Sequence, residues 1–136
     1  MHELSKSSIR HYETCHHQLQ RLVTFVRAKR AIAVIRGYRS TDDQARAFRT
    51  GASNAKPGES KHNAYPSLAV DIAPVEALPL WAIRKDLSKE EWKAFGAEVM
   101  EIAKEHKINI RWGGDWDGDG DFTDQKLFDA VHFELL

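Results

Sequence analysis

The stretch from Ser60 to Pro74 contains a histidine and an aspartate in a setting that indicates metal binding. His62 lies in a polar loop flanked by glycine and proline, and Asp71 interrupts a short apolar segment of leucine, valine, isoleucine and alanine. Burying a carboxylate among apolar residues is costly unless a positive group holds it. A metal ion is such a group, and His62 is a suitable second ligand. We therefore interpret this stretch as the source of two ligands of a catalytic zinc site.

A third ligand is offered by His132, in the alternating segment 131–135 close to the end of the chain. If this segment is a strand, Val131 and Phe133 face the core and His132 faces the opposite side. A lone histidine on such a face is usually only a hydrogen-bonded polar side chain, but here His62 and Asp71 need a partner. Two histidines, one aspartate and a water form the arrangement of a catalytic zinc ion, which suits amide hydrolysis.

Such a site also needs a proton-transfer group that is not a ligand. Asp129, three residues before His132, would lie at the entrance of the last strand. There it could take a proton from the attacking water and return it to the leaving amine. The alternative is an aspartate that only forms a turn at the end of a strand, and for Asp129 taken alone that alternative is favoured.

A carboxylate-rich loop follows the predicted strand at 108–112. Its aspartates occupy positions 1, 3 and 5, and a glycine occupies position 6, as in the first half of an EF-hand calcium loop. Position 12 is Lys126, where an EF-hand has a bidentate glutamate, so a complete EF-hand is excluded. We predict a tighter calcium site, because alternating aspartates repel one another without a cation; the other interpretation is a solvated turn. The candidate calcium ligands are Asp115, Asp117, Asp119 and Asp121.

The spacing of apolar residues and of capping residues predicts the elements that position these side chains. The last two strands are joined by a connection too short for a crossover helix, so we expect them to pair antiparallel. The sequence thus predicts a single α+β domain over residues 1–136, with a mainly antiparallel sheet and helices packed on it. The predicted elements are a helix over 7–29, a strand over 31–35, a short helix from 41 to 51, a strand around Asp71, a long helix after Ser88 and strands over 108–112 and 131–135.

The composition of the 136-residue chain is that of a soluble globular protein. Twenty basic and twenty acidic residues cancel, and the absence of a global positive charge disfavours nucleic-acid binding. Cys15 is the single cysteine and cannot form an intrachain disulfide. The N-terminus lacks the apolar core of a signal peptide, and no apolar run approaches the ~20 residues that cross a bilayer. We expect synthesis in the cytoplasm without a signal peptide, and no membrane insertion.

The chain carries an ordered set of motifs: Gly37-Tyr38-Arg39-Ser40 with Gln44, the pattern Ser-x-His…Ala-x-Asp-x-x-Pro from Ser60 to Pro74, and the closing Asp129-x-x-His132. These motifs resemble those of the VanY-like zinc D-alanyl-D-alanine carboxypeptidases. They are more closely similar to those of the phage endolysins of that group, which are L-alanyl-D-glutamate peptidases. The resemblance covers nearly the whole chain and implies a fold of the Hedgehog/DD-peptidase type.

The resemblance also implies a role for each matched residue. Eight residues separate His62 from Asp71, more than the family usually has, and the extra Tyr65-Pro66-Ser67 would bulge the loop without moving Asp71. Some endolysins of this group carry a calcium-responsive acidic loop, which implies a regulatory Ca²⁺ here. The implied roles are Zn²⁺ binding by His62, Asp71 and His132, acid/base catalysis by Asp129, oxyanion stabilisation by Arg39, and support of the site or substrate by Ser60 and Gln44.

These observations predict a zinc-dependent peptidoglycan peptidase, a phage endolysin that cuts the L-alanyl-D-glutamate bond of bacterial stem peptides and causes host lysis. It would act as a monomer on the cell wall in the periplasm, after release from the host cytoplasm, and without a separate wall-binding domain. One alternative is a D,D-carboxypeptidase or dipeptidase that acts on D-Ala-D-Ala termini with the same metal site. Another is a calcium-dependent, non-catalytic wall-binding module, against which the intact set of histidines and aspartates argues.

Overall fold

The computed structural model describes residues 3–53, 55–77, 87–116, 118 and 129–136. Its helices are α1 (Lys6–Tyr12), α2 (His17–Lys29), α3 (Thr41–Arg49) and α4 (Lys89–Glu105), with short 3-10 helices η1 (Lys61–Asn63) and η2 (Val75–Ala77). Its strands are β1 (Ile32–Arg36), β2 (Ala69–Pro74), β3 (Ile110–Trp112) and β4 (His132–Leu135). The strands form one sheet in the order β1-β2-β4-β3, with antiparallel pairing between every pair of neighbours. The predicted α+β class with a mainly antiparallel sheet is confirmed.

The register of the sheet lines up polar side chains across one of its faces. Asp71 of β2 lies directly opposite His132 of β4, and Glu134 of β4 lies directly opposite Arg111 of β3. Side chains alternate between the two faces of a strand, so the next residues along each strand point the other way. Those neighbours are buried in the core: Ile72, Trp112 and Phe133. One face of the sheet is therefore polar where the other is apolar.

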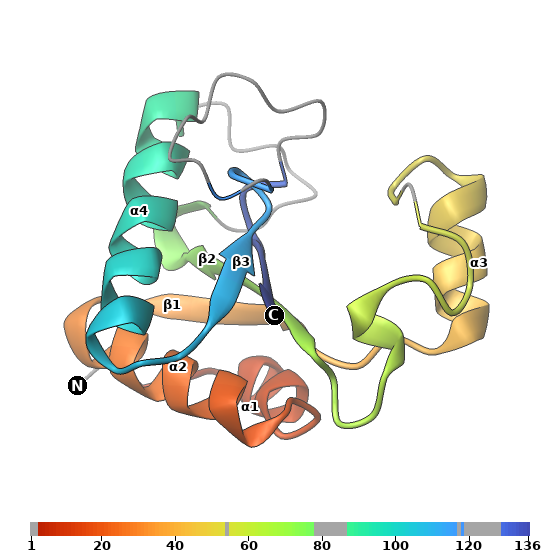
Figure 1. Ribbon diagram of the computed structural model, residues 1–136, viewed down its shortest axis with the longest axis horizontal. Coiled ribbons are helices and arrows are strands. Elements are labelled where there is room, and N and C mark those ends of the chain that lie inside the picture. The colour runs from red at the N-terminus through yellow and green to blue at the C-terminus, as the bar shows by residue number, and fades with distance from the viewer. Residues whose placement is uncertain (1–2, 54, 78–86, 117, 119–128) are drawn as a thin grey trace.

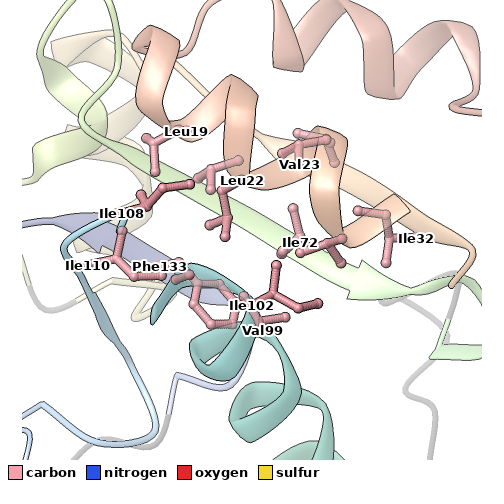
Figure 2. Packing of buried hydrophobic residues seen from close by; sticks show 14 of the residues in the cluster. Leu19, Leu22, Val23, Ile32, Ile72, Val99, Ile102, Ile108, Ile110 and Phe133 are labelled. Atoms are coloured by element: carbon pink, nitrogen blue, oxygen red, sulfur yellow. The ribbon is translucent and has the colours of Figure 1, made fainter. Parts of the chain in front are cut away.

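The apolar face of the sheet is covered by α2 and α4, which also contact each other (Figure 1). Figure 2 shows Leu19 and Leu22 of α2 on one side of the core and Val99 and Ile102 of α4 on another, with side chains of the strands between them. These four residues are at most 2% exposed. Since the core occupies this face, the opposite face of the sheet is left to carry the polar residues.

The prediction of a single helix over 7–29 is wrong, because the structure divides this segment into α1 and α2. The segment between the two helices pairs with Ser67. The Ser67 N–H donates to the Thr14 carbonyl at 2.8 Å, and the His16 N–H donates to the Ser67 carbonyl at 2.9 Å. His16 then caps α2, since its Nδ1 accepts a hydrogen bond from the Gln18 N–H at 3.1 Å. The break in the helix thus anchors the chain just before β2.

The helix α3 stands apart from the sheet, to the right in Figure 1. It begins as the sequence predicts, at Ser40, whose Oγ accepts a hydrogen bond from the Asp43 N–H at 3.1 Å. The loop after α3 and the polar face of the sheet line one cleft of about 780 Å³. In the part of the chain that the structure describes, no helix is long and apolar enough to span a bilayer.

Candidate active site

His62 is fixed by contacts at both nitrogens of its ring. It lies in η1, which begins at Ser60, and the Ser60 Oγ accepts a hydrogen bond from the His62 N–H at 3.1 Å. The His62 Nδ1 lies 2.7 Å from the Gly37 carbonyl oxygen. Because a carbonyl can only accept, Nδ1 is the protonated nitrogen and donates this bond. In the neutral ring Nε2 then carries the lone pair, and it points at Asp71 Oδ1, 3.1 Å away.

Asp71 lies between the two histidines. Its Oδ1 is 3.1 Å from His62 Nε2 and 3.3 Å from His132 Nδ1. Both histidines are buried, and 13% of the Asp71 side chain is exposed. One ligand atom from each of the three residues lies within 4.8 Å of the other two. The structure thus brings together the three side chains that the sequence indicates as metal ligands, while their binding of a metal stays a prediction.

The charges of these residues stabilise one another. Burial alone would raise the pKa of Asp71, but the positive charge of His62 and the hydrogen bonds from both histidines outweigh it, so the pKa lies well below its usual range. Burial alone would lower the pKa of His132, but hydrogen bonds to Asp71 and Glu134 raise it to about 9. Without a metal, therefore, the proton on His132 helps to balance the charge of the aspartate. A divalent cation would take over that balance.

The donor set fits a zinc ion. Zinc bonds of ~2.0–2.2 Å at tetrahedral angles place ligand atoms ~3.3 Å apart, and the two separations from Asp71 Oδ1 are 3.1 and 3.3 Å. Two imidazoles and one carboxylate are ligands that zinc prefers, and three protein ligands leave a fourth position for water or substrate. The cluster lines the cleft, so this fourth position is accessible.

Asp129 is positioned through its backbone. Its N–H donates to the Gly113 carbonyl at 2.9 Å, and the Gly113 N–H donates to the His132 carbonyl at 2.8 Å. A side chain at residue 113 would not fit, because a Cβ there would lie 2.2 Å from the Asp129 carbonyl oxygen. Burial and the nearby Asp71 carboxylate raise the pKa of Asp129 above its ordinary value, and the positive charges of His132, His62 and Arg39 offset this only in part. A carboxyl whose pKa is raised toward neutrality is suited to both accepting and returning a proton.

Arg39 lines the same cleft and is held by Gln44. The Arg39 Nη1 donates to Gln44 Oε1 at 3.0 Å. Gln44 is fully buried, and its Nε2 donates to Ser53 Oγ at 2.9 Å and to the Ala55 carbonyl at 2.7 Å. Burial lowers the pKa of Arg39, whereas the carboxylates of Asp71 and Asp129 favour the charged form. Gln44 therefore aims a permanently charged guanidinium into the cleft.

Two predictions about neighbouring residues have different outcomes. Phe133 packs in the core as predicted, but the prediction that Val131 faces the core is wrong: Val131 precedes β4, is half buried and lines the cleft.

Of the predicted calcium ligands, Asp115 lies in the turn after β3, where its N–H donates to the Trp112 carbonyl at 3.0 Å. The other three, Asp117, Asp119 and Asp121, lie outside the described residues, so calcium binding stays a prediction.

A family model described as phage L-alanyl-D-glutamate peptidase matches residues 1–136. The chain belongs to this family. As a member of it, the chain is an enzyme, a peptidase of the L-alanyl-D-glutamate class that hydrolyses peptidoglycan. No curated protein sequence matches the chain significantly.

One solved structure shows the same fold, and a second is less similar. The L-Ala D-Glu endopeptidase ChiX of Serratia marcescens matches with a TM-score of 0.69 and 22% identity, over 98% of this chain and 90% of that chain. A structure of the LdcB LD-carboxypeptidase has a TM-score of 0.46 and 18% identity, over 88% of this chain and 56% of that one. The first match confirms the fold of this family member.

Sequence reasoning missed three charged residues of the peptidase cleft. Glu134, Arg111 and Lys61 all line it, and Glu134 is buried. Glu134 accepts a hydrogen bond from Arg111 Nη2 at 2.8 Å, and Lys61 Nζ lies 3.7 Å from the same carboxylate. One signal was present in the sequence: Glu134 is two residues after His132 and so shares its face of the strand.

Proposed function

We propose that this peptidase is zinc-dependent and that His62, Asp71 and His132 hold the ion. The observation that carries the proposal is that three ligand atoms lie within 4.8 Å of one another at a cleft of about 780 Å³. A zinc ion bound there supplies a Lewis acid that polarises the scissile carbonyl and makes a water molecule more acidic. The remaining steps fall to residues of the chain itself.

Asp129 is the proposed general base and general acid. Its carboxylate accepts the proton of the attacking water and then returns it to the nitrogen of the leaving D-glutamyl residue. Its raised pKa supports this role, because a carboxyl that is too acidic would not return the proton. Its place in the cleft beside His132 and Val131 supports it as well.

Arg39 is the proposed stabiliser of the oxyanion that forms at the attacked carbonyl. A guanidinium that is already aimed by Gln44 needs little rearrangement when the negative charge develops. Ser60 and Gln44 act as positioning residues: Ser60 caps the short helix of His62, and Gln44 holds Arg39. We further propose that residues 1–136 form one catalytic domain, which acts as a monomer on the bacterial wall after release from the host cytoplasm.

The test is digestion of purified sacculi together with metal analysis of the protein. We expect one zinc per chain and, by mass spectrometry of the fragments, new amino-terminal D-glutamate from cleavage of the L-alanyl-D-glutamate bond. Chelation of the metal should stop the release of fragments, and added zinc should restore it. Release of terminal D-alanine instead would assign the protein to the D,D-carboxypeptidases, and full activity in metal-free protein would refute the zinc proposal.

A further inference from the structure

Glu134 is a buried carboxylate that lies beside the metal cluster without belonging to it. It is 7% exposed and sits on the polar face of β4, two residues after His132. Its two oxygens have separate partners. Oε1 lies 2.8 Å from His132 Nε2, and Oε2 lies 2.8 Å from Arg111 Nη2. Each oxygen thus has a hydrogen-bond partner that offsets the energetic cost of burying the charge.

The contact with Glu134 determines which nitrogen of His132 faces the cluster. An ionised carboxylate can only accept, so His132 Nε2 carries the proton and donates it to Glu134. In the neutral ring Nδ1 then holds the lone pair, and Nδ1 is the nitrogen that points at Asp71, 3.3 Å away. In its other tautomer the ring would present an N–H proton to the position where a metal would bind, and a flipped ring would present a carbon there.

The two histidines of the cluster are supported in different ways. The distal nitrogen of His62 donates to the neutral Gly37 carbonyl, and that of His132 donates to the charged Glu134. A carboxylate acceptor makes an imidazole a stronger donor to a metal than a carbonyl does. Glu134 itself is unsuited to be a ligand, because its two oxygens are engaged by His132 and Arg111.

Arg111 and Lys61 hold Glu134 in place. Arg111 lies directly opposite Glu134 in the pairing of β3 with β4, so the register of the sheet fixes their ion pair. Lys61 approaches from the neighbouring η1, where its Nζ also donates to the Leu135 carbonyl. The side chain of Glu134 is thus restrained from two elements at once.

We propose that Glu134, restrained by Arg111, is a positioning residue that sets the tautomer and the ring orientation of His132 for metal binding through Nδ1. The inference rests on the proposed zinc site and goes beyond it, because it concerns a residue that touches neither metal nor substrate. Metal affinity then depends on the carboxylate of Glu134, which is not itself a ligand.

The experiment measures zinc affinity, by competition with a chromophoric chelator, in the wild-type chain and in Glu134→Gln and Glu134→Ala. We expect affinity to fall in that order, by roughly 10- to 100-fold for the alanine variant. Glutamine keeps an oxygen acceptor but loses the charge, so its loss should be smaller. Glu98→Gln is the matched control, since Glu98 is also paired with an arginine, Arg30 at 3.2 Å, but contacts no histidine of the cluster.

A second readout separates positioning from a general effect on folding. In the zinc-loaded wild type, long-range proton–nitrogen NMR correlations should show His132 protonated at Nε2, and the Glu134→Ala variant should show a shift or exchange broadening of that signal. Circular dichroism of the metal-free proteins checks that the variants are folded. Folded variants with wild-type zinc affinity, or a wild-type ring protonated at Nδ1, would overturn the inference while leaving the zinc site intact. A wild-type chain that takes up no zinc would overturn both proposals.

Discussion

At the scale of single residues, the side chains proposed for catalysis have little freedom to move. Asp129 is held through its backbone by Gly113, Arg39 through its guanidinium by Gln44, and His62 through its ring by a carbonyl. Groups that are already placed for the transition state do not have to reorganise during the reaction. Substitutions that remove a functional atom but keep its volume should therefore affect catalysis more than folding.

Asp129→Asn is the sharpest test of the proton-transfer group. The amide occupies the same volume but cannot accept a proton from water, so we expect the rate of sacculus digestion to fall by roughly 10²- to 10⁴-fold. Zinc content and melting temperature should stay close to those of the wild type, because Asp129 is not in the ligand group. Turnover near the wild-type rate would remove Asp129 from the mechanism.

Cys15 offers a test of burial. It is 4% exposed, and burial raises the pKa of its thiol to about 12. The thiolate is the reactive form, so the native protein should react very slowly with a chromogenic disulfide reagent at pH 8, and the denatured chain should react fast. The fold favours the neutral thiol over the thiolate. The preference of the folded state for the neutral Cys15 thiol therefore contributes fully to stability below pH 9, and this contribution is lost as the pH rises toward 12. Rapid reaction of the native protein would contradict the packing around Cys15.

At the scale of elements, two glycines allow other parts of the chain to pack closely against the end of β3. Gly113, directly after the strand, allows the segment of Asp129 to come close, and Gly96 of α4 allows the helix to lie against Trp112. A Cβ at residue 96 would lie 2.1 Å from Cζ2 of Trp112. One glycine thus serves the cleft and the other serves the core.

Gly113→Ala should impair catalysis by moving Asp129. The added methyl would collide with the Asp129 carbonyl, which is backbone and cannot rotate away. We expect the rate constant for peptide release to fall by ~10-fold or more, in line with the sensitivity of catalysis to ~1 Å displacements. Zinc titration of the same variant should show a smaller change, and an unchanged rate would show that the segment of Asp129 can adjust.

Gly96→Ala should destabilise the fold although alanine is the better helix former. At an open helical position the change would gain up to ~1 kcal/mol, whereas overpacking against Trp112 costs ~1–3 kcal/mol. Chemical denaturation would measure the difference. Ala97→Gly, on the exposed side of the same helix, is the control, and it should cost only ~1 kcal/mol. A more stable Gly96→Ala protein would contradict the close contact with Trp112.

At the scale of the whole molecule, the cluster joins three elements of the fold, and His132 comes from a part of the chain that lies far in sequence from His62 and Asp71. His62 comes from η1, Asp71 from β2 and His132 from β4, and the cleft is completed by the loop after α3. A ligand that binds only where these parts meet stabilises the folded state over the unfolded state. Metal content should therefore be visible in the unfolding of the whole domain.

Removal of zinc should lower the melting temperature. At a free zinc concentration ~1,000 times the dissociation constant, binding contributes ~4 kcal/mol, which corresponds to a shift on the order of 10 °C for a domain of this size. Differential scanning calorimetry with and without a chelator measures it. His132→Ala should melt at the same temperature under both conditions, and an equal response of this variant to chelator would point to a zinc site elsewhere.

The sequence predicted the class of the fold and the grouping of His62, Asp71 and His132, because a carboxylate in an apolar strand needs a positive partner wherever it occurs. It failed where the outcome depends on distant contacts. The apolar period of 7–29 gives no sign of a break at residues 14–16, where the structure pairs the chain with Ser67 and the helix is interrupted. Glu134 was likewise missed: alternation puts it on the same face of β4 as His132, but only the pairing of β3 with β4 brings Arg111 opposite it.

The pairing of Ser67 with the segment between α1 and α2 has a consequence for protein engineering. The loop between His62 and Ser67 is secured at both ends, by the Arg39 N–H donating to the His62 carbonyl at 2.7 Å and by the two hydrogen bonds of Ser67. Between these anchors, Tyr65 is 72% exposed, and Pro66 is exposed as well. We therefore expect a dye, an affinity tag or a foreign peptide attached at Tyr65 or Pro66 to leave the proposed metal ligands His62 and Asp71, which lie on either side, undisturbed.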